Sequence, residues 1–132
     1  MITSVLCLAT AVFFEARDQS TEGQYAVAEV VMNRVESSRW PDDTCGVVYQ
    51  SKQFSFTHDG STEGMSPEEL NFLDGVAWEK ALNIATSVLD GEVIGLKSTH
   101  YHTTYVLPYW AKHYHADGRI GDHLFYTAPA GK

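Results

Sequence analysis

The feature that most constrains the fold is an uncharged apolar segment, ITSVLCLATAVFF, that leads directly into Glu15-Ala16-Arg17. Its hydrophobic residues recur at spacings of three and four, which predicts a mostly buried helix. The segment has no basic start, no small-residue cleavage site and too few residues to cross a bilayer, so we interpret it as part of the fold. A carboxylate at the end of such a helix is either a solvated charge or a group held in an apolar pocket.

Two further segments show the same helical period. The pair Thr21 and Gln24 has capping-box form, and the apolar stripe that follows predicts a second helix that includes Arg34. The run Ser66-Pro67-Glu68-Glu69 fits an N-cap followed by proline at the first helical position. The stripe after it predicts a third helix that ends at Asp90-Gly91.

Short extended segments are expected between and after these helices. Val47-Val48-Tyr49 and Phe54-Ser55-Phe56 each fit one short turn or strand, and pairing between them is one option. Beyond Gly91 the helical period is lost, and residues 99–105 and 124–126 fit short strands or extended loop. With 132 residues and no repeat or linker, we predict one domain spanning residues 1–132. Its expected class is α+β, mostly α, with a small irregular β part.

The charge distribution excludes some partners. The formal net charge is −8, and all acidic residues except Asp117 and Asp122 lie in residues 1–92. A chain of this charge repels nucleic acid and anionic membranes, so neither is an expected partner. The final third instead holds tyrosines and a tryptophan among five of the six histidines. That composition fits one wall of a cleft for a polar ligand, and it fits ordinary packing equally well.

The cysteines and histidines leave alternatives open. Cys7 lies in an apolar run and fits a buried small hydrophobic residue, and a disulfide between Cys7 and Cys45 is the alternative. The runs His100-Tyr101-His102 and His113-Tyr114-His115 each place two imidazoles on one face of a strand, as metal ligands often are. Because no Cys pair or HExxH pattern accompanies them, structural histidines are the simpler interpretation, and we expect no metal and no other cofactor. A G-x-S-x-G motif for a nucleophilic serine and a Gly-rich phosphate loop are also missing from the sequence.

Glu15 is the first candidate for catalysis. Cleavage of a glycosidic bond needs a carboxylic acid that protonates the leaving oxygen, and desolvation keeps such an acid protonated near neutral pH. Phe13 and Phe14 supply apolar surroundings of this kind. The alternative is a solvated glutamate at a helix end that pairs with Arg17.

These scattered signals fall into one ordered set of blocks. The blocks are EAR (15–17), EGQYAVA (22–28), VMNRV (31–35), WP (40–41), CGVVYQ (45–50), QFSF (53–56), HYH (100–102), PYWA (108–111) and IGDHLFY (120–126). In this order they resemble the cell-wall hydrolase family of the spore-cortex lytic enzymes SleB and CwlJ. The blocks span nearly the whole chain.

The resemblance implies a lysozyme-like catalytic domain that cleaves the β-1,4 bond between N-acetylmuramic acid and N-acetylglucosamine in peptidoglycan. The family's catalytic glutamate, in the E-A-R block, corresponds to Glu15, which would protonate the leaving oxygen and later accept a proton. A single acid favours lytic transglycosylation, in which the muramic 6-hydroxyl attacks and a 1,6-anhydro product forms, because hydrolases usually need a carboxylate pair. Asp18-Gln19 departs from the Gly-Glu that many relatives carry there, so an auxiliary carboxylate is either displaced to Asp18 or missing, and its role stays open.

Five further residues in these blocks are predicted to line the substrate cleft, namely Gln53, Ser55, Tyr101, His102 and Trp110. Amide, hydroxyl and imidazole groups suit the N-acetyl and hydroxyl groups of a glycan strand, and aromatic faces suit sugar rings. For each of them a packing role is the alternative. His123 is expected to be structural.

We therefore predict a peptidoglycan lytic transglycosylase that acts on glycan strands as a monomer. Without an export signal in this sequence, the expectation is a phage endolysin made in the cytoplasm and released to the wall, or an excised domain of a secreted enzyme. The alternatives are a hydrolytic muramidase, a His-metal amidase or peptidase, and a non-catalytic glycan-binding module.

Overall fold

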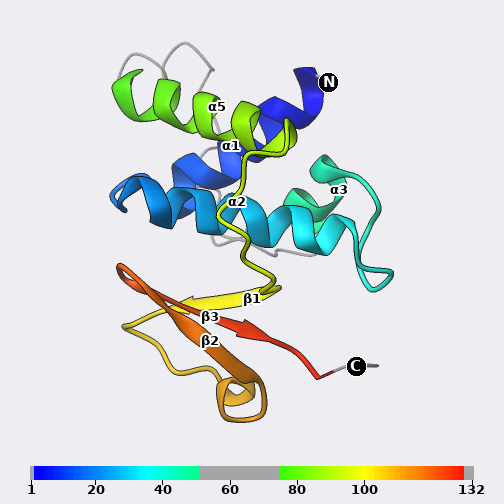
Figure 1. Cartoon of the computed structure of the whole chain (residues 1–132), viewed down its shortest axis with the longest axis vertical. Coiled ribbons are helices and arrows are strands. Elements are labelled where there is room, and N and C mark those ends of the chain that lie inside the picture. Colours follow the sequence, from blue (N-terminus) through cyan, green and yellow to red (C-terminus); the bar gives the residue numbers. More distant parts are fainter. Residues whose placement is uncertain (1, 51–74, 130–132) are drawn as a thin grey trace.

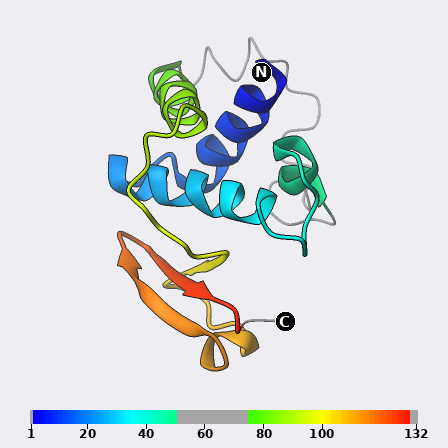
Figure 2. The same ribbon diagram turned by 45° about the vertical axis from the view of Figure 1, so that its right-hand side comes forward.

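A computed structural model of the chain describes residues 2–50 and 75–129. The elements in these ranges are α1 (Ile2–Ala16), α2 (Thr21–Val35), α3 (Thr44–Tyr49), α5 (Gly75–Leu89), β1 (His100–Thr103), the 3-10 helix η3 (Tyr109–Lys112), β2 (His115–Ile120) and β3 (His123–Thr127). The helices form one side of the molecule and the strands the other, with α2 lying between them (Figures 1 and 2). The predicted α+β class, mostly α, is confirmed.

The apolar first segment forms the centre of the helical core. Leu8, Val12 and Phe13 of α1 are fully buried and pack with residues of α2, α3 and α5. This burial explains why the helix carries no charge before its last turn. A disulfide joins Cys7 of α1 to Cys45 of α3, with their Cα atoms 5.2 Å apart, so the disulfide alternative is correct. No helix within the described ranges is both long and apolar enough to cross a membrane.

The second helix starts one residue earlier than its capping-box pattern predicted. Ser20 has extended backbone angles and is the N-cap, and its Oγ accepts a hydrogen bond from Gly23 N at 3.1 Å. Thr21 is therefore already helical. Gln24 instead donates its side-chain amide to Gln19 O at 3.2 Å, so it ties the helix to the preceding turn.

Residues 47–49 lie in the helix α3, so the predicted turn or strand is wrong. The Asp43 carboxylate is the N-cap and accepts a hydrogen bond from Gly46 N at 2.6 Å, which starts a helical turn. Val47 and Val48 are both fully buried against the other helices. The predicted segment 54–56 and the predicted start of the third helix at Ser66 lie outside the described residues.

The described part of the third helix, α5, ends as predicted. Leu89 is its last residue, and Gly91 adopts a φ of +97°. Two hydrogen bonds close the end, from Gly91 N to Val88 O at 3.0 Å and from Glu92 N to Ser87 O at 2.9 Å. A glycine in the left-handed region is the common way to stop a helix.

The sheet has the strand order β1-β3-β2, and both pairs are antiparallel. β1 and β3 fall in the predicted segments 99–105 and 124–126, whereas β2 is a strand that the sequence did not predict. Ala116 pairs with Tyr126 and Gly118 with Phe125, so Asp117 is the extra residue of a β-bulge. The sequence predicted that Gly118 interrupts the extended structure, but it lies inside the strand at this bulge.

One face of the sheet packs on α2. Phe125 of β3 is buried with Ala26 and Val30, which lie one turn apart on the helix. Leu96, Tyr101 and Ile120 are the partly buried neighbours of this small cluster. The contact places the strands directly below the helix, where Figure 1 shows them.

Polar side chains of α2 hold the segment that leads into β1. The buried Glu29 carboxylate accepts hydrogen bonds from the backbone N–H groups of Ile94 at 2.6 Å, Gly95 at 3.0 Å and Leu96 at 2.9 Å. One turn further along, Asn33 Nδ2 donates to Leu96 O and Ser98 O at 2.8 Å each, and Arg34 Nε donates to Thr99 O at 2.7 Å. This polar clamp fixes where β1 begins.

Candidate active site

Glu15 lies half-buried in the last turn of α1. This is the C-terminal end of the helix, where the backbone dipole is negative and does not stabilise a carboxylate. An acidic side chain stabilises a helix at its N-terminal end, where Glu22 lies in the first turn of α2. The position of Glu15 is therefore not explained by helix stability.

Tyr101 of β1 contacts the Glu15 carboxyl group directly. Its Oη donates a hydrogen bond to Glu15 Oε1 at 3.0 Å, although the two residues are 86 positions apart. Burial raises the pKa of Tyr101 well above its ordinary value, the Glu15 charge and hydrogen bond raise it further, and Arg34 opposes these effects. The phenol therefore stays protonated and remains a donor. The structure brings the predicted acid and one predicted cleft residue together.

A pocket of about 250 Å³ opens beside this pair. One wall is the end of α1 with the turn after it, residues 14–19, and the other is formed by Thr103, Tyr105, Asp122 and His123. Of the two phenylalanines expected around Glu15, Phe14 lines the pocket, whereas Phe13 is fully buried in the helical core. Consecutive helical side chains point about 100° apart, so the two rings cannot line the same pocket wall.

Gln19 and Asp122 connect the two walls of the pocket. Gln19 Nε2 donates to Asp122 Oδ2 at 3.1 Å, and Asp122 N donates to Gln19 Oε1 at 2.9 Å. Gly121 has a φ of +59°, and a Cβ at this position would collide with Gln19 Oε1. The positive φ and the close approach of Gln19 therefore both favour glycine at 121, and the amide of Gln19 both donates and accepts a hydrogen bond there.

Two further acids line the pocket together with Glu15. They are Asp18, which is exposed, and Asp122. Sequence reasoning named Asp18 only as a possible replacement for an auxiliary carboxylate, and it did not single out Asp122. Asp122 is partly buried and already accepts a hydrogen bond from Gln19, whereas Asp18 is exposed. Asp18 is therefore the better candidate for a second carboxylate that acts beside Glu15.

His123 also lines the pocket, although a structural role was expected for it. The residue is 3% exposed, its ring packs edge-on against Tyr101 with centroids 5.0 Å apart, and its buried Nδ1 has no hydrogen-bond partner. Burial lowers the pKa of His123, with Asp122 opposing and His102 adding to the shift. A neutral imidazole therefore supports the Tyr101 ring.

The predicted cleft residues His102 and Trp110 lie away from this pocket. Side chains alternate across a strand, so Tyr101 points to Glu15 while His102 points to the opposite face of β1. There His102 Nε2 is hydrogen-bonded to Tyr126 Oη at 2.9 Å, and its Nδ1 lies 2.7 Å from Thr103 O. Trp110 packs against His102, with ring centroids 5.7 Å apart. Gln53 and Ser55 lie outside the described residues.

His100 shares this opposite face with His102, as the strand spacing predicted. Its ring packs against Trp40, Trp110 and Tyr114. Burial, with the charges of Arg34 and Arg39, lowers its pKa to about 4. Within residues 2–50 and 75–129 no group of three or more His, Cys, Asp or Glu side chains is arranged to hold a metal ion.

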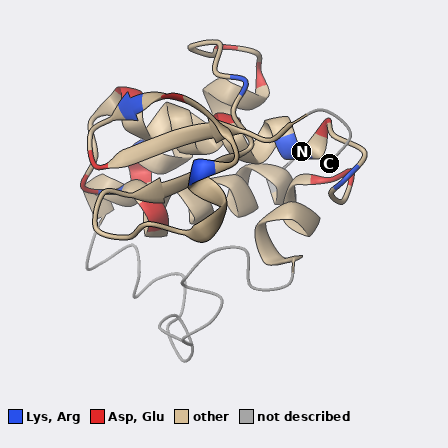
Figure 3. Cartoon of the chain, turned by 90° about the horizontal axis from the view of Figure 1, so that it is seen from below, with Lys and Arg blue, Asp and Glu red and all other residues tan. Residues whose placement is uncertain are grey.

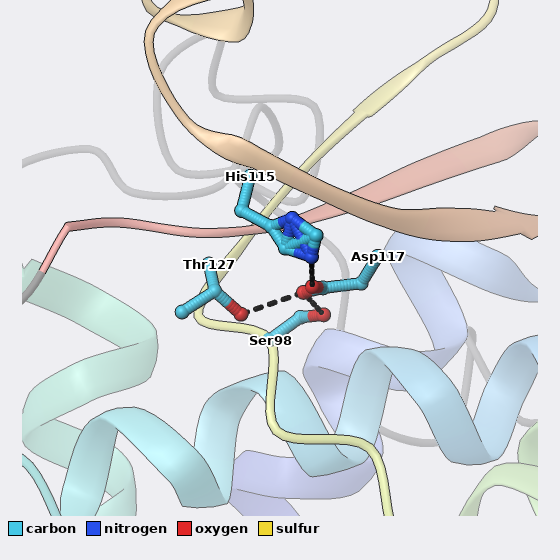
Figure 4. A network of polar contacts seen from close by, with 4 residues as sticks. All are labelled: Ser98, His115, Asp117 and Thr127. Atoms are coloured by element: carbon cyan, nitrogen blue, oxygen red, sulfur yellow. Dashed lines mark hydrogen bonds and ion pairs between the residues drawn. The ribbon is translucent and has the colours of Figure 1, made fainter.

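A second polar cluster is built on the bulge of β2. Figure 4 shows Ser98, His115 and Thr127 around Asp117, whose carboxylate accepts from Ser98 Oγ at 2.5 Å and from Thr127 Oγ1 at 2.6 Å. His115 Nε2 lies 3.9 Å from Asp117 Oδ1. In a nucleophilic triad the imidazole stands between serine and carboxylate, whereas here the carboxylate stands in the middle. The cluster therefore attaches β2 to the segment before β1 and does not activate Ser98.

The family model for cell wall hydrolases matches residues 18–126. The chain belongs to the cell wall hydrolase family. This membership confirms the resemblance drawn from the ordered sequence blocks, and with it the assignment to a family of wall-degrading enzymes. The matched range contains Tyr101, Asp122 and His123 and begins just after Glu15.

Curated relatives of this cell wall hydrolase are spore cortex-lytic enzymes. That of Oceanobacillus iheyensis is 43% identical over 53 residues, which are 40% of this chain and 19% of the relative. That of Bacillus subtilis is 40% identical over 62 residues, which are 47% of this chain and 20% of the relative. The aligned part thus makes up about a fifth of the length of these relatives.

Two solved structures share the fold. The catalytic domain of the germination-specific lytic transglycosylase SleB from Bacillus anthracis aligns with a TM-score of 0.75, covering 94% of this chain and 93% of that domain at 24% identity. The catalytic domain of the Bacillus cereus SleB protein aligns with a TM-score of 0.72, covering 96% and 91% at 24% identity. The helices and the small sheet are therefore arranged as in these domains.

Proposed function

We propose that this chain cleaves the glycan strands of peptidoglycan as a lytic transglycosylase, at the β-1,4 bond that follows N-acetylmuramic acid. The observation that carries the proposal is the Glu15 carboxyl group, held by Tyr101 at the edge of a pocket between α1 and the sheet. Membership of the cell wall hydrolase family supports the substrate class. A fold shared with the catalytic domain of a lytic transglycosylase supports the reaction class.

In the proposed reaction Glu15 acts first as an acid and then as a base. Its protonated carboxyl group gives a proton to the glycosidic oxygen as the bond from that oxygen to the muramic C1 breaks. The muramic 6-hydroxyl oxygen then bonds to C1, and its proton returns to Glu15. One product keeps a 4-hydroxyl end, the other has a 1,6-anhydro ring, and no water is consumed.

Tyr101 has a positioning role in this scheme. A carboxyl group near the end of a helix can rotate, and the hydrogen bond from Tyr101 Oη fixes Oε1. Because the pKa of Tyr101 is raised, the phenol does not titrate while Glu15 cycles between its two forms. His123 and Phe125 pack against the Tyr101 ring and keep the donor in place.

Hydrolysis by the same pocket is the second candidate, and Asp18 is the observation that favours it. Its carboxylate lines the pocket with Glu15, so an acid and a base are available on the same wall. A hydrolase needs such a pair, with the second group activating or replacing a water molecule. The two candidates differ in their products, since hydrolysis adds one water to each cleaved bond.

Mass analysis of muropeptides tests both candidates. Purified peptidoglycan is digested with the wild type, Glu15→Gln, Asp18→Asn and, as a matched control, Glu22→Gln, an exposed acid of α2. The proposal expects anhydro products with the wild type, activity lower by at least about a hundredfold in Glu15→Gln, and no change in Glu22→Gln. Reducing-end products that are lost in Asp18→Asn would establish hydrolysis. Full activity in Glu15→Gln would show that Glu15 is not the acid.

The site of action proposed here is the cell wall outside the cytoplasm. The Cys7–Cys45 disulfide supports this, because disulfides persist in oxidising surroundings and are uncommon in the cytosol. Free-thiol titration of the chain recovered from lysed cells and from the culture medium tests the point. The proposal expects the disulfide only in the exported fraction. Equal thiol content in both fractions would contradict it.

A further inference from the structure

A loop beside the candidate site exposes several large apolar side chains. Between β1 and η3, Tyr105 is 78% exposed, Val106 55% and Leu107 85%, and Tyr109, the first residue of η3, is 83% exposed. Soluble proteins rarely gather so many exposed apolar groups without a ligand or partner for them. We call residues 105–109 the aromatic loop.

The loop is held firmly at both ends. Thr104 N, just before it, donates to Asp122 O at 2.9 Å, and Val106 N donates to Thr103 O at 3.3 Å. After it, Ala111 N donates to Pro108 O at 3.1 Å, and the Trp110 ring stacks on Tyr114 with centroids 5.2 Å apart. The exposed side chains are therefore presented by an anchored segment.

The aromatic loop meets the Glu15 pocket at Tyr105. Tyr105 lines that pocket together with Glu15, Thr103 and His123. A ligand seated in the pocket therefore reaches Tyr105 first, and Tyr109 lies four residues further along the loop. This contact separates the loop from an isolated hydrophobic patch.

The charge of the loop decides between ligand classes. Residues 103–111 carry no charged side chain. Figure 3 shows the sheet side of the described chain, where most of the ribbon is uncharged and the Lys, Arg, Asp and Glu residues are scattered. An uncharged surface with two exposed phenol rings suits the apolar face of a neutral pyranose ring, which stacks on aromatic side chains. A phospholipid surface or an acidic partner would be met by a cluster of cations.

We propose that the aromatic loop extends the candidate active site as a glycan platform, on which Tyr105 and Tyr109 stack against N-acetylated sugar rings next to the cleaved bond. This inference rests on the proposed function and names the residues that bind the strand beyond the reacting sugars. Binding energy from such remote rings also raises the rate when it positions the scissile bond. Tyr105 and Tyr109 are then substrate-binding residues, with their ring faces and not their hydroxyl groups making the contact.

The test measures binding and cleavage separately. Binding of chitohexaose, an oligomer of β-1,4-linked N-acetylglucosamine, and of purified peptidoglycan is measured in a Glu15→Gln background, with Tyr105→Ala, Tyr109→Ala, Tyr105→Phe and Tyr109→Phe added singly. Tyr49→Ala is the matched control, since Tyr49 is 52% exposed on α3. The same loop substitutions in the wild type are assayed for KM and kcat on peptidoglycan, and circular dichroism checks the fold.

Each alanine variant is expected to raise the dissociation constant and KM about tenfold, while the phenylalanine variants and Tyr49→Ala stay within about twofold of their parent. If the wild type cleaves peptidoglycan and the alanine variants bind and cleave as well as their parent, the platform is wrong and the proposed function stands. Phenylalanine variants as weak as the alanine variants would also overturn it, because the hydroxyl groups would then make the contact. A wild type that neither binds nor cleaves would overturn both proposals.

Two further outcomes identify another occupant. Vesicles of phosphatidylethanolamine and phosphatidylglycerol are used in the same binding assay, and sedimentation reports self-association. Vesicle binding or dimer formation that is lost in Tyr105→Ala and Tyr109→Ala, with glycan binding unchanged, would contradict the platform. Loss of glycan binding alone supports it.

Discussion

Tyr101 Oη lies 3.0 Å from Glu15 Oε1, so a hydrogen bond joins the first helix to the first strand in the candidate site. Removing the hydroxyl group with Tyr101→Phe keeps the ring that packs on His123 and Phe125. A hydrogen bond to a charged group contributes about 1.5–3 kcal/mol, so kcat/KM is expected to fall about tenfold or more. The measurement is the initial rate of peptidoglycan cleavage.

The pH profile distinguishes a positioning role for Tyr101 from a purely structural one. The donor stabilises the charged form of the carboxyl group, so its loss favours the protonated form and moves the alkaline limb of the rate profile to higher pH. Tyr126→Phe is the matched control, because its hydroxyl group bonds His102 on the other face of the sheet. A lower rate with an unshifted profile in Tyr101→Phe would argue against the role given to it.

The clamp on α2 predicts a large stability effect from a small substitution. Glu29→Gln is expected to lower the free energy of unfolding by about 2–3 kcal/mol, because three backbone N–H groups lose the carboxylate they bond and one amide group points its own hydrogens at them. Glu36→Gln, at the exposed C-cap of the same helix, is expected to change it by less than about 0.5 kcal/mol. Urea unfolding followed by circular dichroism measures both, and equal midpoints would show that the clamp does not stabilise the fold.

His100 makes stability depend on pH. Its folded-state pKa is about 4, below the ordinary 6.5, because of burial and the charges of Arg34 and Arg39. Between these values the unfolded chain binds more protons than the folded one, so the free energy of unfolding falls as the pH is lowered from about 6.5 to about 4. Because His100 is only half-buried and solvent screens its charge, the expected fall is about 2 kcal/mol, less than the full shift would give. His100→Phe is expected to flatten this slope in a series of urea unfolding curves.

The remaining slope and the control come from other histidines. The pKa of His123 is also lowered, so part of the acid destabilisation persists in His100→Phe. His113→Gln, at an exposed position, is expected to leave the slope unchanged. The same slope in His100→Phe and the wild type would show that His100 is not held neutral by the fold.

The disulfide predicts a further stability change. Cys7 and Cys45 are 38 positions apart, and closing a loop of this length restricts the unfolded chain by about 4 kcal/mol on the chain-entropy estimate. Reduction, or the Cys7→Ala and Cys45→Ala double variant, is expected to lower the melting temperature by about 10 °C or more. Calorimetry with and without reductant measures the shift, and the double variant should no longer respond to reductant.

The three long helices and two of the strands could be predicted from the sequence because their signals are local. The apolar period of α1, the break before α2 and the Asp90-Gly91 stop of α5 are all set by neighbouring residues. α3 was misread because two adjacent β-branched valines favour a strand, whereas the Asp43 cap and the burial of both valines select a helix. β2 was missed because the residues from His115 to Arg119 are all exposed and lack an apolar alternation.

The candidate site was predicted only in part, for a related reason. Glu15 and Tyr101, which the structure brings together, were singled out because their sequence blocks are recognisable. The roles of Asp18, Asp122 and His123 follow from a pocket that joins residues about a hundred positions apart, and no local pattern encodes that distance. His102 and Trp110 were predicted to line the cleft because imidazole and aromatic groups suit a glycan, yet strand alternation and the η3 turn direct them to the other face.

The bulge at Asp117 also affects how the protein behaves at high concentration. β2 is an edge strand, and an exposed regular edge invites strands of other molecules to pair with it. Asp117 turns its carboxylate inward to Ser98 and Thr127, and the bulge interrupts the spacing of the backbone groups on either side of it. The edge therefore offers a poor template for a second chain, which protects a small sheet against aggregation without a covering helix.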